Sequence, residues 1–453
     1  MEGAGLIRKA FRLEPAGRVP WVPFVGVHAA KLLGIGAEDY LKSSDNIVRG
    51  VSEAIKLYNP DGIPVVFDLQ IEAEALGCRL KWSENSPPSV ISHPLQEGVK
   101  LEDLKIPLPA AGRIGVVMDA TRTLRAMHSD TALYGLITGP FTLALHLVGT
   151  DIFMKMFESP EEVNGIMDFC TGVATMTAGQ FIESGCDVIA MVDPMTSQID
   201  PGSFGTFVSE HATKIFSYIK ERGALSSFFV CGNARQNIEA MCLCRPDNIS
   251  IDENIPLDFV RDTALAHNIS FGGNMRLTTV LLMGSEADSR REALECMDTG
   301  GRRGFVLAPG CDLPIDTPPA NLRAVTELVH DEMMQGELRA SSVTVAEVEK
   351  ADLTGHWSSD KVVIDIVTLD SASCAPCQYM TDAVKRASLP FGEKVVCTEH
   401  KITTREGVEM MAALGVKNLP SIVIDGNIEF VSQIPPVDTI RKSIARYLDA
   451  RQG

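Results

Sequence analysis

Two cysteines in the last quarter of the chain have the spacing of a redox-active pair. Cys374 and Cys377 enclose Ala-Pro in the stretch SASCAPCQYM, which follows an apolar strand-like run and precedes a helical pattern. At the first turn of a helix, backbone N–H groups and the helix dipole stabilise a thiolate on the first cysteine. The second cysteine, one turn further on, is placed to attack a mixed disulfide formed by the first. No second pair of cysteines or histidines with ligand spacing lies nearby in the sequence, so a redox dithiol is favoured over a zinc knuckle.

Two further cysteines stand at the ends of apolar runs. Cys231 is the last residue but one of the run SSFFVCG, and Cys311 directly follows the run GFVLAPG. Polar or ligand-forming residues occupy the same place in the other runs, and the full set is His28, Asp68, Thr138, Asp193, Cys231, Asp252, Asn274 and Cys311. A thiol at such a place can bind a metal, act as a nucleophile or fill space in the core. The choice depends on which strand ends come together.

The order of the elements predicts that these ends do come together. Up to about residue 335, apolar runs alternate with amphipathic helical stretches, which indicates a parallel sheet covered by helices. The runs are 21–27, 62–68, 132–138, 187–193, 226–232, 248–253, 268–274 and 304–310. Eight such runs predict an α/β fold, a (β/α)8 TIM barrel over residues 1–335, whose strand ends converge on one face. Residues 77–98, with turn residues between two short runs, are predicted to form an inserted β-hairpin.

The rest of the chain is predicted to form a separate α/β domain. Residues 336–357 lose the alternating pattern and are the predicted linker, and residues 358–453 the second domain. Its elements follow the order strand, CAPC motif, helix, strand, helix, strand and helix. Cys397 lies inside an apolar stretch and is expected to be buried.

Composition excludes several classes of partner. The chain has 41 Lys plus Arg against 59 Asp plus Glu, a formal charge of −18, which argues against a nucleic-acid partner. No apolar run approaches the roughly 18 residues that span a bilayer, and the first residues do not have the pattern of a signal peptide. We therefore expect a cytoplasmic protein with no membrane partner. Eleven cysteines among 453 residues are too sparse for a disulfide scaffold, so most are expected to be reduced.

The C-terminal segment resembles the thioredoxin superfamily. The resemblance rests on CAPCQYM followed by GVKNLPS, and it extends over the whole segment. In that family a cis-proline packs against the dithiol, and Pro420 occupies its place. The resemblance implies a thioredoxin-like domain in which Cys374 and Cys377 exchange disulfides.

Residues 5–335 resemble the uroporphyrinogen decarboxylase superfamily, and within it the corrinoid-dependent methyltransferases. The markers are IEAEALGC, GPFTLALHLVG, CDVIAMVDP, VCGN, SIDE and LAPGCDLPIDTPPANLRA, in this order and spacing. The decarboxylases have an arginine-rich segment after the first strand that holds the carboxylates of the substrate. Here that segment reads VGVHAAKLLGIG, with one Lys and no Arg, so a porphyrinogen substrate is disfavoured. Asp68 nevertheless aligns with the catalytic aspartate of the decarboxylases, which keeps decarboxylation as an alternative.

The methyltransferase resemblance also implies a metal site. Thiol-directed members of that branch bind zinc through a His-x-Cys at the fifth strand and a distant cysteine at the eighth. Cys231 and Cys311 match both cysteines, but Phe229 stands where the histidine is expected. Catalytic zinc usually has three protein ligands, so the third would have to come from another strand end. The candidates are His28, Asp68, Glu72 and Asp193. The alternative is a pair of redox-active thiols without metal.

The resemblance implies a methyltransferase that works with a methylated corrinoid protein and a small-molecule methyl donor or acceptor. No Asp-x-His-x-x-Gly cobalamin motif occurs in the chain, so the corrinoid is expected on a partner protein. Substrate contacts are expected from His28, Glu72, Asp193, Asp252 and Asn274. The competing interpretation is a thiol-regulatory redox protein whose barrel performs no methyl chemistry.

Overall fold

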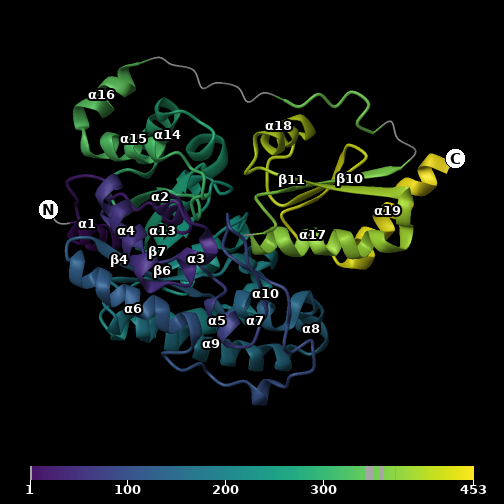
Figure 1. The fold of residues 1–453 in the computed structure, drawn as a ribbon, viewed down its shortest axis with the longest axis horizontal. Coiled ribbons are helices and arrows are strands. Elements are labelled where there is room, and N and C mark those ends of the chain that lie inside the picture. The colour runs from purple at the N-terminus through teal and green to yellow at the C-terminus, as the bar shows by residue number, and fades with distance from the viewer. Residues whose placement is uncertain (1–2, 342–349, 358–360, 373, 453) are drawn as a thin grey trace. The chain divides into compact units, whose positions relative to one another are not determined.

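The computed structural model describes residues 3–341, 350–357, 361–372 and 374–452, and these divide between two compact units (Figure 1). The first unit comprises residues 1–196 and 200–342, and the second comprises residues 197–199 and 343–453. In the described part of the chain, no helix is long and apolar enough to cross a membrane.

The first unit is built on a parallel sheet of seven strands. Their order in the sheet is β1-β4-β5-β6-β7-β8-β9, and every neighbouring pair is parallel. The strands are β1 (Gly62–Pro64), β4 (Ala132–Thr138), β5 (Val188–Val192), β6 (Leu225–Val230), β7 (Asn248–Ile251), β8 (Ser270–Met275) and β9 (Phe305–Pro309). All of their residues are buried except Leu225, as expected for strands covered on both faces.

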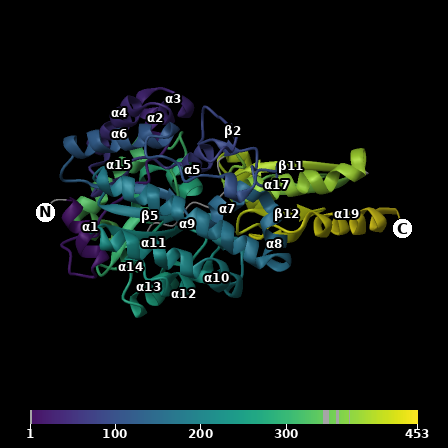
Figure 2. The ribbon, with the colours of Figure 1, turned by 90° about the horizontal axis from the view of Figure 1, so that it is seen from below.

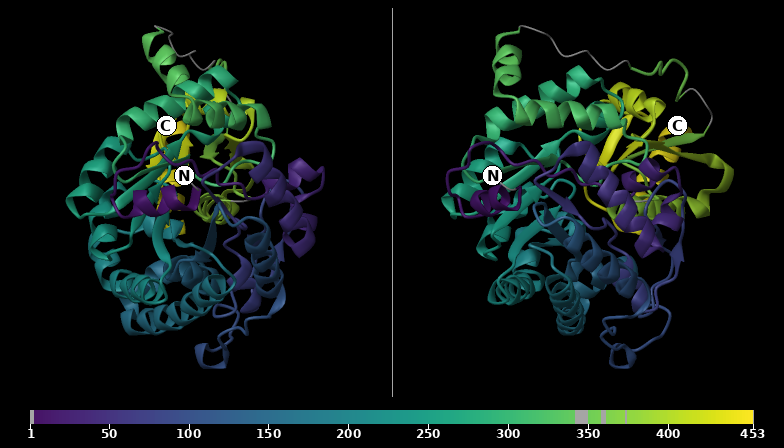
Figure 3. Two further views of the ribbon diagram at one scale, coloured as in Figure 1. Left: turned by 90° about the vertical axis from the view of Figure 1, so that its left-hand side faces the viewer. Right: turned by 60° about the vertical axis from the view of Figure 1, so that its left-hand side comes forward.

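Helices follow the strands and cover the outside of this sheet (Figures 2 and 3). The helices before β4 are α1 (Gly3–Phe11), α2 (His28–Leu33), α3 (Ala37–Leu41), α4 (Ser44–Tyr58), α5 (Ile71–Ala75) and α6 (Gly112–Met127). Those after it are α7 (Pro140–Val148), α8 (Ile152–Glu158), α9 (Pro160–Glu183), α10 (Pro201–Phe207), α11 (Ser209–Glu221), α12 (Ile238–Leu243), α13 (Leu257–Ala266), α14 (Glu286–Gly300), α15 (Pro319–His330) and α16 (Glu332–Ala340). The short turns are η1 (Leu101–Asp103), η2 (Gly149–Asp151), η3 (Pro194–Gln198), η4 (Arg235–Asn237) and the π-helix η5 (Leu277–Leu282).

The fold is therefore TIM-barrel-like, but the prediction of eight strands is wrong by one. In the segment predicted as the first strand, 21–27, a single parallel bridge joins Trp21 to Leu307 of β9. The amide of Leu307 donates to Pro20 O at 2.9 Å, and the amide of Asp61, just before β1, donates to Trp21 O at 2.9 Å. Pro20 and Pro23 have no N–H to continue a ladder, which explains why the strand stops after one bridge.

The carboxylate of Asp61 holds this bridging segment in place. It accepts two hydrogen bonds from the guanidinium of Arg18, at 2.6 and 2.8 Å, and one from the amide of Trp21 at 2.8 Å. Asp61 is buried, so these three donors replace the water that its charge would otherwise need. The gap between β9 and β1 is closed by backbone and carboxylate hydrogen bonds rather than by a full strand.

The predicted hairpin insertion is confirmed. Strands β2 (Leu80–Lys81) and β3 (Ser89–Val90) pair antiparallel, with Leu80 opposite Val90. Trp82, which follows β2, lies under two cations: the Arg113 guanidinium carbon is 4.8 Å and the Lys42 Nζ is 4.2 Å from its ring centroid. The hairpin thereby covers the start of α6.

The second unit is a mixed four-stranded sheet in the order β11-β10-β12-β13. Strands β10 (Val362–Thr368) and β11 (Val395–Lys401) are parallel, whereas β12 (Ser421–Ile424) pairs antiparallel with β10 and with β13 (Asn427–Val431). Helices α17 (Ala375–Ser388) and α19 (Val437–Gln452) lie on one face and α18 (Arg405–Leu414) on the other, while η6 (Leu389–Lys394) follows α17 (Figure 1). Val362, Ile364 and Ile366 pack against α17 and α19 in the core.

Two details of this region differ from the sequence predictions. Helix α16 continues to Ala340, so the first residues of the predicted linker 336–357 are helical, and its residues 342–349 lie outside the described part of the chain. Cys397 is exposed rather than buried, because β11 is an edge strand and its outer face is uncovered. Residues 358–360, 373 and 453 of the predicted second domain also lie outside the described residues.

Candidate functional site

The structure brings Cys231 and Cys311 together at the carboxyl ends of the barrel strands. Cys231 directly follows β6, and Cys311 lies two residues beyond β9, on the other side of β7 and β8 in the sheet. Their Sγ atoms are 2.7 Å apart, and both residues are half-buried. This separation lies between the roughly 2.05 Å of a disulfide and ordinary non-bonded contact. The two thiols can therefore act as one unit.

Phe229 forms part of the apolar floor beneath the two thiols. Its ring centroid lies 5.2 Å from that of Phe24 and 5.9 Å from that of Phe67, which are 6.0 Å from each other. Cys231 and Cys311 pack against the hydrophobic cluster that contains these three rings. Side chains alternate along a strand, so Phe229 and Cys231 point to the same face, the barrel interior.

Asp252 supports the backbone next to Cys231. Its carboxylate accepts hydrogen bonds from the amide of Gly232 and from the amide and side chain of Asn254, both at 2.9 Å. Gly232 has a φ of +87°, a conformation that glycine adopts without strain. Burial raises the pKa of Asp252. This residue positions the turn after β6 rather than presenting a free carboxylate.

Glu253 offers the carboxylate oxygen that the surrounding backbone does not use. Its Oε1 accepts from the amide of Leu277 at 3.3 Å, whereas its Oε2 has no hydrogen-bond partner among the described residues. A side chain at Gly310 would place its Cβ 2.1 Å from Oε2, so this oxygen lies against the backbone that leads into Cys311. Burial, followed by the charge of Asp252, raises the pKa of Glu253 to about 8.

Asp312 is a second buried carboxylate beside the cysteines. A side chain at Gly26 would place its Cβ 2.2 Å from Asp312 Oδ1, which has no hydrogen-bond partner among the described residues. Burial raises the pKa of Asp312 well above its ordinary value, and the backbone N–H groups of Gly26 and Leu313 oppose that shift.

The other predicted strand-end residues have partners within the barrel. His28 is the first residue of α2. Its Nε2 lies 2.8 Å from the Tyr58 hydroxyl, and its Nδ1 lies 3.2 Å from Ile315 O. Burial lowers the pKa of His28 to about 4, so its ring is neutral at pH 7. The carboxylate of Glu72 accepts from the Thr138 amide at 3.2 Å and hydroxyl at 2.9 Å, and burial raises its pKa to about 7.

Asp193 and Asn274 also bind backbone. The Asp193 carboxylate accepts from the amides of Phe141, at 3.1 Å, and Thr142, at 2.8 Å, and thus caps the start of α7. Burial raises the pKa of Asp193 to about 6. The Asn274 amide donates to Ile255 O at 2.9 Å and to Asp252 O at 3.2 Å, which fixes the loop after β7.

Asp68 is held in a buried ion pair. Its carboxylate binds Nη1 of Arg113 and accepts from the amide of Gln70 at 2.8 Å. Nε of Arg113 lies 2.5 Å from Glu74 Oε2. This arginine comes from the start of α6, and both of its partners are carboxylates of the chain itself.

A zinc ion at the cysteine pair lacks a third ligand in this arrangement. Across the described residues, one group of three His, Cys, Asp or Glu side chains has its ligand atoms within 4.8 Å of one another, and it is His356, Asp365 and His400 in the second unit. The proposed third ligands, His28, Asp68, Glu72 and Asp193, are engaged as described above. Catalytic zinc has three protein ligands, so Cys231 and Cys311 alone do not fit it.

The CAPC pair of the second unit lies at the start of a helix, as its spacing predicts. Cys374 is the residue before α17, and Pro376 lies in the first turn of that helix. Cys374 is half-buried and Cys377 is fully buried. The Leu419–Pro420 peptide bond is cis.

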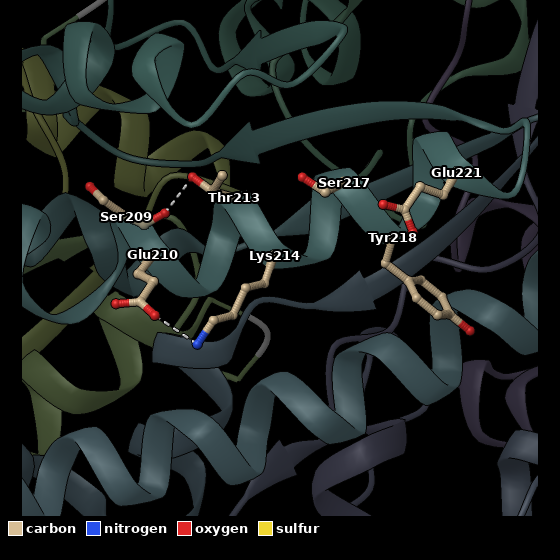
Figure 4. A pocket seen from close by; sticks show the side chains of 7 residues that line it. All are labelled: Ser209, Glu210, Thr213, Lys214, Ser217, Tyr218 and Glu221. Carbon is tan, nitrogen blue, oxygen red and sulfur yellow. Dashed lines mark hydrogen bonds and ion pairs between the residues drawn. The ribbon is translucent and has the colours of Figure 1, made fainter.

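A pocket of about 550 Å³ lies elsewhere in the first unit, along one helix (Figure 4). Its lining residues all belong to α11, and they are Ser209, Glu210, Thr213, Lys214, Ser217, Tyr218 and Glu221. Lys214 is paired with Glu210 at 2.8 Å. Because one helix supplies the whole lining, this surface provides no converging set of catalytic groups.

Comparison with known proteins identifies the family of the first unit. The family model described as uroporphyrinogen decarboxylase (URO-D) matches residues 4–332. The chain belongs to the URO-D family. The matched segment ends before residue 343, where the C-terminal part of the second unit begins, so membership rests on the barrel.

Relatives within the URO-D family have two kinds of name. Methylcobamide:CoM methyltransferase MtbA of Methanosarcina acetivorans is 27% identical over 326 residues, 70% of this chain and 95% of the relative. A uroporphyrinogen decarboxylase of Anaeromyxobacter sp. is 23% identical over 341 residues, 71% of this chain and 97% of the relative. A solved structure, a methyltransferase from Methanosarcina mazei, aligns with a TM-score of 0.68 at 24% identity, over 75% of this chain and 99% of its own. That similarity shows the shared fold.

Three kinds of residue that take part in these sites were not predicted from the sequence. Glu253 and Asp312 each follow a predicted site residue directly, and that adjacency was the available signal. Arg113 lies at a helix start with no signal in the surrounding sequence. His356 and His400 are far apart in sequence: the pairing of β10 and β11 brings His400 to Asp365, and His356 reaches the same carboxylate from the segment before β10.

We predict that Phe229→His supplies the third zinc ligand that the cysteine pair of this protein lacks. An imidazole on the same face of β6 as Cys231 would complete a three-ligand set with the two thiolates. Relative to the wild-type protein, the variant should retain about one additional zinc ion per chain after dialysis, measured by mass spectrometry of the metal. Phe228→His is the matched control, because Phe228 faces α10 and α11 on the other side of the same strand. Equal zinc contents of wild type and Phe229→His would contradict the assignment of position 229.

Proposed function

We propose that this protein is a methyltransferase that moves a methyl group between a corrinoid carried by a partner protein and a thiol or another small acceptor. The observation that carries the proposal is the contact of Cys231 and Cys311 at the strand ends of a URO-D family barrel. The relatives named methylcobamide:CoM methyltransferase support it. Active sites of TIM barrels are formed at this end of the strands.

The apolar floor and the thiols above it suit a methyl group and a sulfur atom. The rings of Phe24, Phe67 and Phe229 exclude water from below, which favours an uncharged methyl carbon over an ionic group. In the transfer to a thiol, the S–C bond forms as the Co–C bond breaks, and the electron pair of the broken bond stays on the cobalt of the partner's corrinoid. The proton of the acceptor thiol must go to a base.

Glu253 is the proposed base. Its Oε2 is buried without a hydrogen-bond partner in the described structure, and buried polar atoms of this kind call for a ligand or a chemical role. Its pKa of about 8 lies close to the pKa of about 8.5 of a free thiol, so proton exchange between them costs little. A base whose pKa is near that of the proton donor works close to its optimum.

The remaining strand-end residues are proposed to shape the site. Asp252 and Asn274 hold the loops after β6 and β7, and Asp193 anchors α7. Glu72 and His28 are proposed as walls of the substrate cavity rather than as groups that react. No step is assigned to zinc, because the cysteine pair does not offer three ligands.

The second unit is proposed to be a thioredoxin-like redox domain that keeps the barrel thiols reduced. A thiolate on Cys374 would attack a Cys231–Cys311 disulfide and form a mixed disulfide. Cys377 would then displace it, leaving Cys231 and Cys311 as thiols and Cys374–Cys377 as the disulfide. Two electrons and two protons pass between the pairs, and no external reductant enters this step. The order of elements and the CAPC pair at the start of α17 support the proposal.

Decarboxylation through Asp68 is less well supported. A porphyrinogen substrate needs cations for its carboxylates, and Arg113 is already bound by Asp68 and Glu74. Asp68 itself is an ion-pair partner in the described structure. The alternative of a redox protein without methyl chemistry does not require a cation for substrate carboxylates. The measurement in the next paragraph distinguishes this alternative from methyl transfer.

We predict that the protein converts methylcobalamin and 2-mercaptoethanesulfonate to the methyl thioether and cob(I)alamin, followed by anaerobic absorbance spectroscopy. Cys231→Ser and Cys311→Ser should each slow the reaction at least about tenfold, the effect of losing about 1.4 kcal/mol of transition-state contact. Cys397→Ser, in an exposed position of β11, is the matched control and should leave the rate unchanged. Thiol oxidation without thioether formation would favour the redox-only alternative and overturn the proposal.

We predict that Glu253→Gln lowers the rate of methyl transfer about 100-fold at pH 7, the contribution expected of a general base. The active form of Glu253 is the carboxylate, so the wild-type rate should rise with pH through about 8 and then level off. The deficit of the variant should shrink toward pH 10, where the acceptor thiol ionises without help. Glu239→Gln, at an exposed glutamate of α12, is the control. A deficit that is constant with pH would contradict the role of Glu253 as a base.

We predict that the double variant Cys374→Ser/Cys377→Ser loses activity in air sooner than wild type, once both proteins have been reduced and desalted, because one reduced CAPC pair can reduce one Cys231–Cys311 disulfide. The barrel thiols would then lack their internal source of electrons, and dithiothreitol should restore activity. Peptide mass spectrometry should show the Cys231–Cys311 disulfide accumulating in parallel. Equal inactivation of the two proteins would contradict the proposed role of the second unit.

A further inference from the structure

A buried carboxylate lies in the middle of the sheet of the second unit. Asp365 is in β10, the strand between β11 and β12, and its side chain is fully buried. Ile364 and Ile366 belong to the core against α17 and α19, so Asp365, which alternates with them, points to the opposite face. A buried carboxylate requires compensating partners, because desolvation of an isolated charge is costly.

Two histidines supply those partners. His400 belongs to β11 and its Nε2 lies 2.8 Å from Asp365 Oδ1. His356 comes from the segment before β10, and its Nε2 lies 2.9 Å from Oδ1 and 3.1 Å from Oδ2. Asp365 pairs with Thr398, and His400, two residues further along, lies on the same face as that pair.

Nε2 of His356, Nε2 of His400 and a carboxylate oxygen of Asp365 are placed as a set of metal ligands. The two Nε2 atoms and a carboxylate oxygen lie within 4.8 Å of one another, and the described residues contain no other such trio. Two imidazoles and one carboxylate are a common three-ligand set for catalytic zinc and for non-haem iron. Ligands about 2.05 Å from a tetrahedral ion are about 3.4 Å apart, so the present spacing needs to widen only slightly to admit one.

Access from solvent agrees with this assignment. The side chains of both histidines are partly exposed, which leaves a path for an ion.

We propose that His356, Asp365 and His400 bind a divalent transition-metal ion, with a fourth coordination position open to water. The ion would join the segment that precedes β10 to the first two strands of the sheet. The site is separate from the barrel cysteines and does not depend on the methyltransferase proposal.

The full-length protein, produced without a histidine tag and dialysed, provides the test. It should contain about one zinc or iron ion per chain by metal mass spectrometry. Zn²⁺ alone, titrated into chelator-treated protein in competition with a chromophoric chelator, should bind at one site. His356→Gln and His400→Gln should each weaken that affinity about 100-fold or more, since even changes in residues behind the ligands cost 10- to 100-fold.

Matched variants separate this site from the thiols. His330→Gln, at an exposed histidine of α15, should retain the wild-type affinity. The double variants Cys231→Ser/Cys311→Ser and Cys374→Ser/Cys377→Ser should retain the metal as well. Co²⁺ added to chelator-treated protein should give visible d–d absorption that is lost in His356→Gln, while far-ultraviolet circular dichroism shows that this variant is folded.

Two results would overturn the proposal. One is a protein that binds no Zn²⁺ or Co²⁺ although it is folded, which would leave a purely hydrogen-bonded His-Asp-His cluster. The other is metal that survives His356→Gln and His400→Gln but disappears with either cysteine pair. Neither result bears on methyl transfer, which is measured separately.

Discussion

The hydrogen bonds of Asp61 close the barrel. Seven strands leave a gap between β9 and β1, and the segment containing Trp21 fills it with one bridge to Leu307 and one contact to the backbone before β1. Asp61 fixes that segment through Arg18 and the Trp21 amide. Without this closure β9 and β1 would be free sheet edges. The loop that contains Cys311 is tied to the closing segment as well, because the amide of Leu313 donates to Phe24 O at 3.0 Å.

Much of the barrel follows from the alternation of apolar runs and helical stretches. That pattern predicts the parallel order and the strand ends that carry Cys231, Asp252 and Cys311, because parallel strands place their carboxyl ends on one face. The missing eighth strand has a local cause in Pro20 and Pro23. The exposure of Cys397 has a tertiary cause, since apolar sequence does not reveal that β11 lies at a sheet edge.

The partners of the site residues are less predictable. Residue type and position suggest that Asp68, Asp193 and His28 are chemical groups, but each is satisfied by a partner distant in sequence: Arg113, the start of α7 and Tyr58. Periodicity contains no information about such pairings. The His356–Asp365–His400 cluster is hidden for the same reason, because strand pairing brings His400 to Asp365 and the path of the segment before β10 brings His356. Phe229 is different, because a phenylalanine side chain cannot bind a metal whatever its surroundings. The residue type alone therefore shows that the expected histidine ligand is absent.

Three of the buried carboxylates share one requirement for space. Asp193, Glu253 and Asp312 lie against Gly139, Gly310 and Gly26, where a Cβ would come within 2.1 to 2.2 Å of the acid. Each acid fits because its neighbour has no side chain. During divergence, an alanine at one of these glycines therefore requires a shift or a substitution of the neighbouring acid. Relatives of this chain should therefore show correlated substitutions at these three pairs, and a glycine retained at position 310 would mark the relatives that keep an acid at position 253.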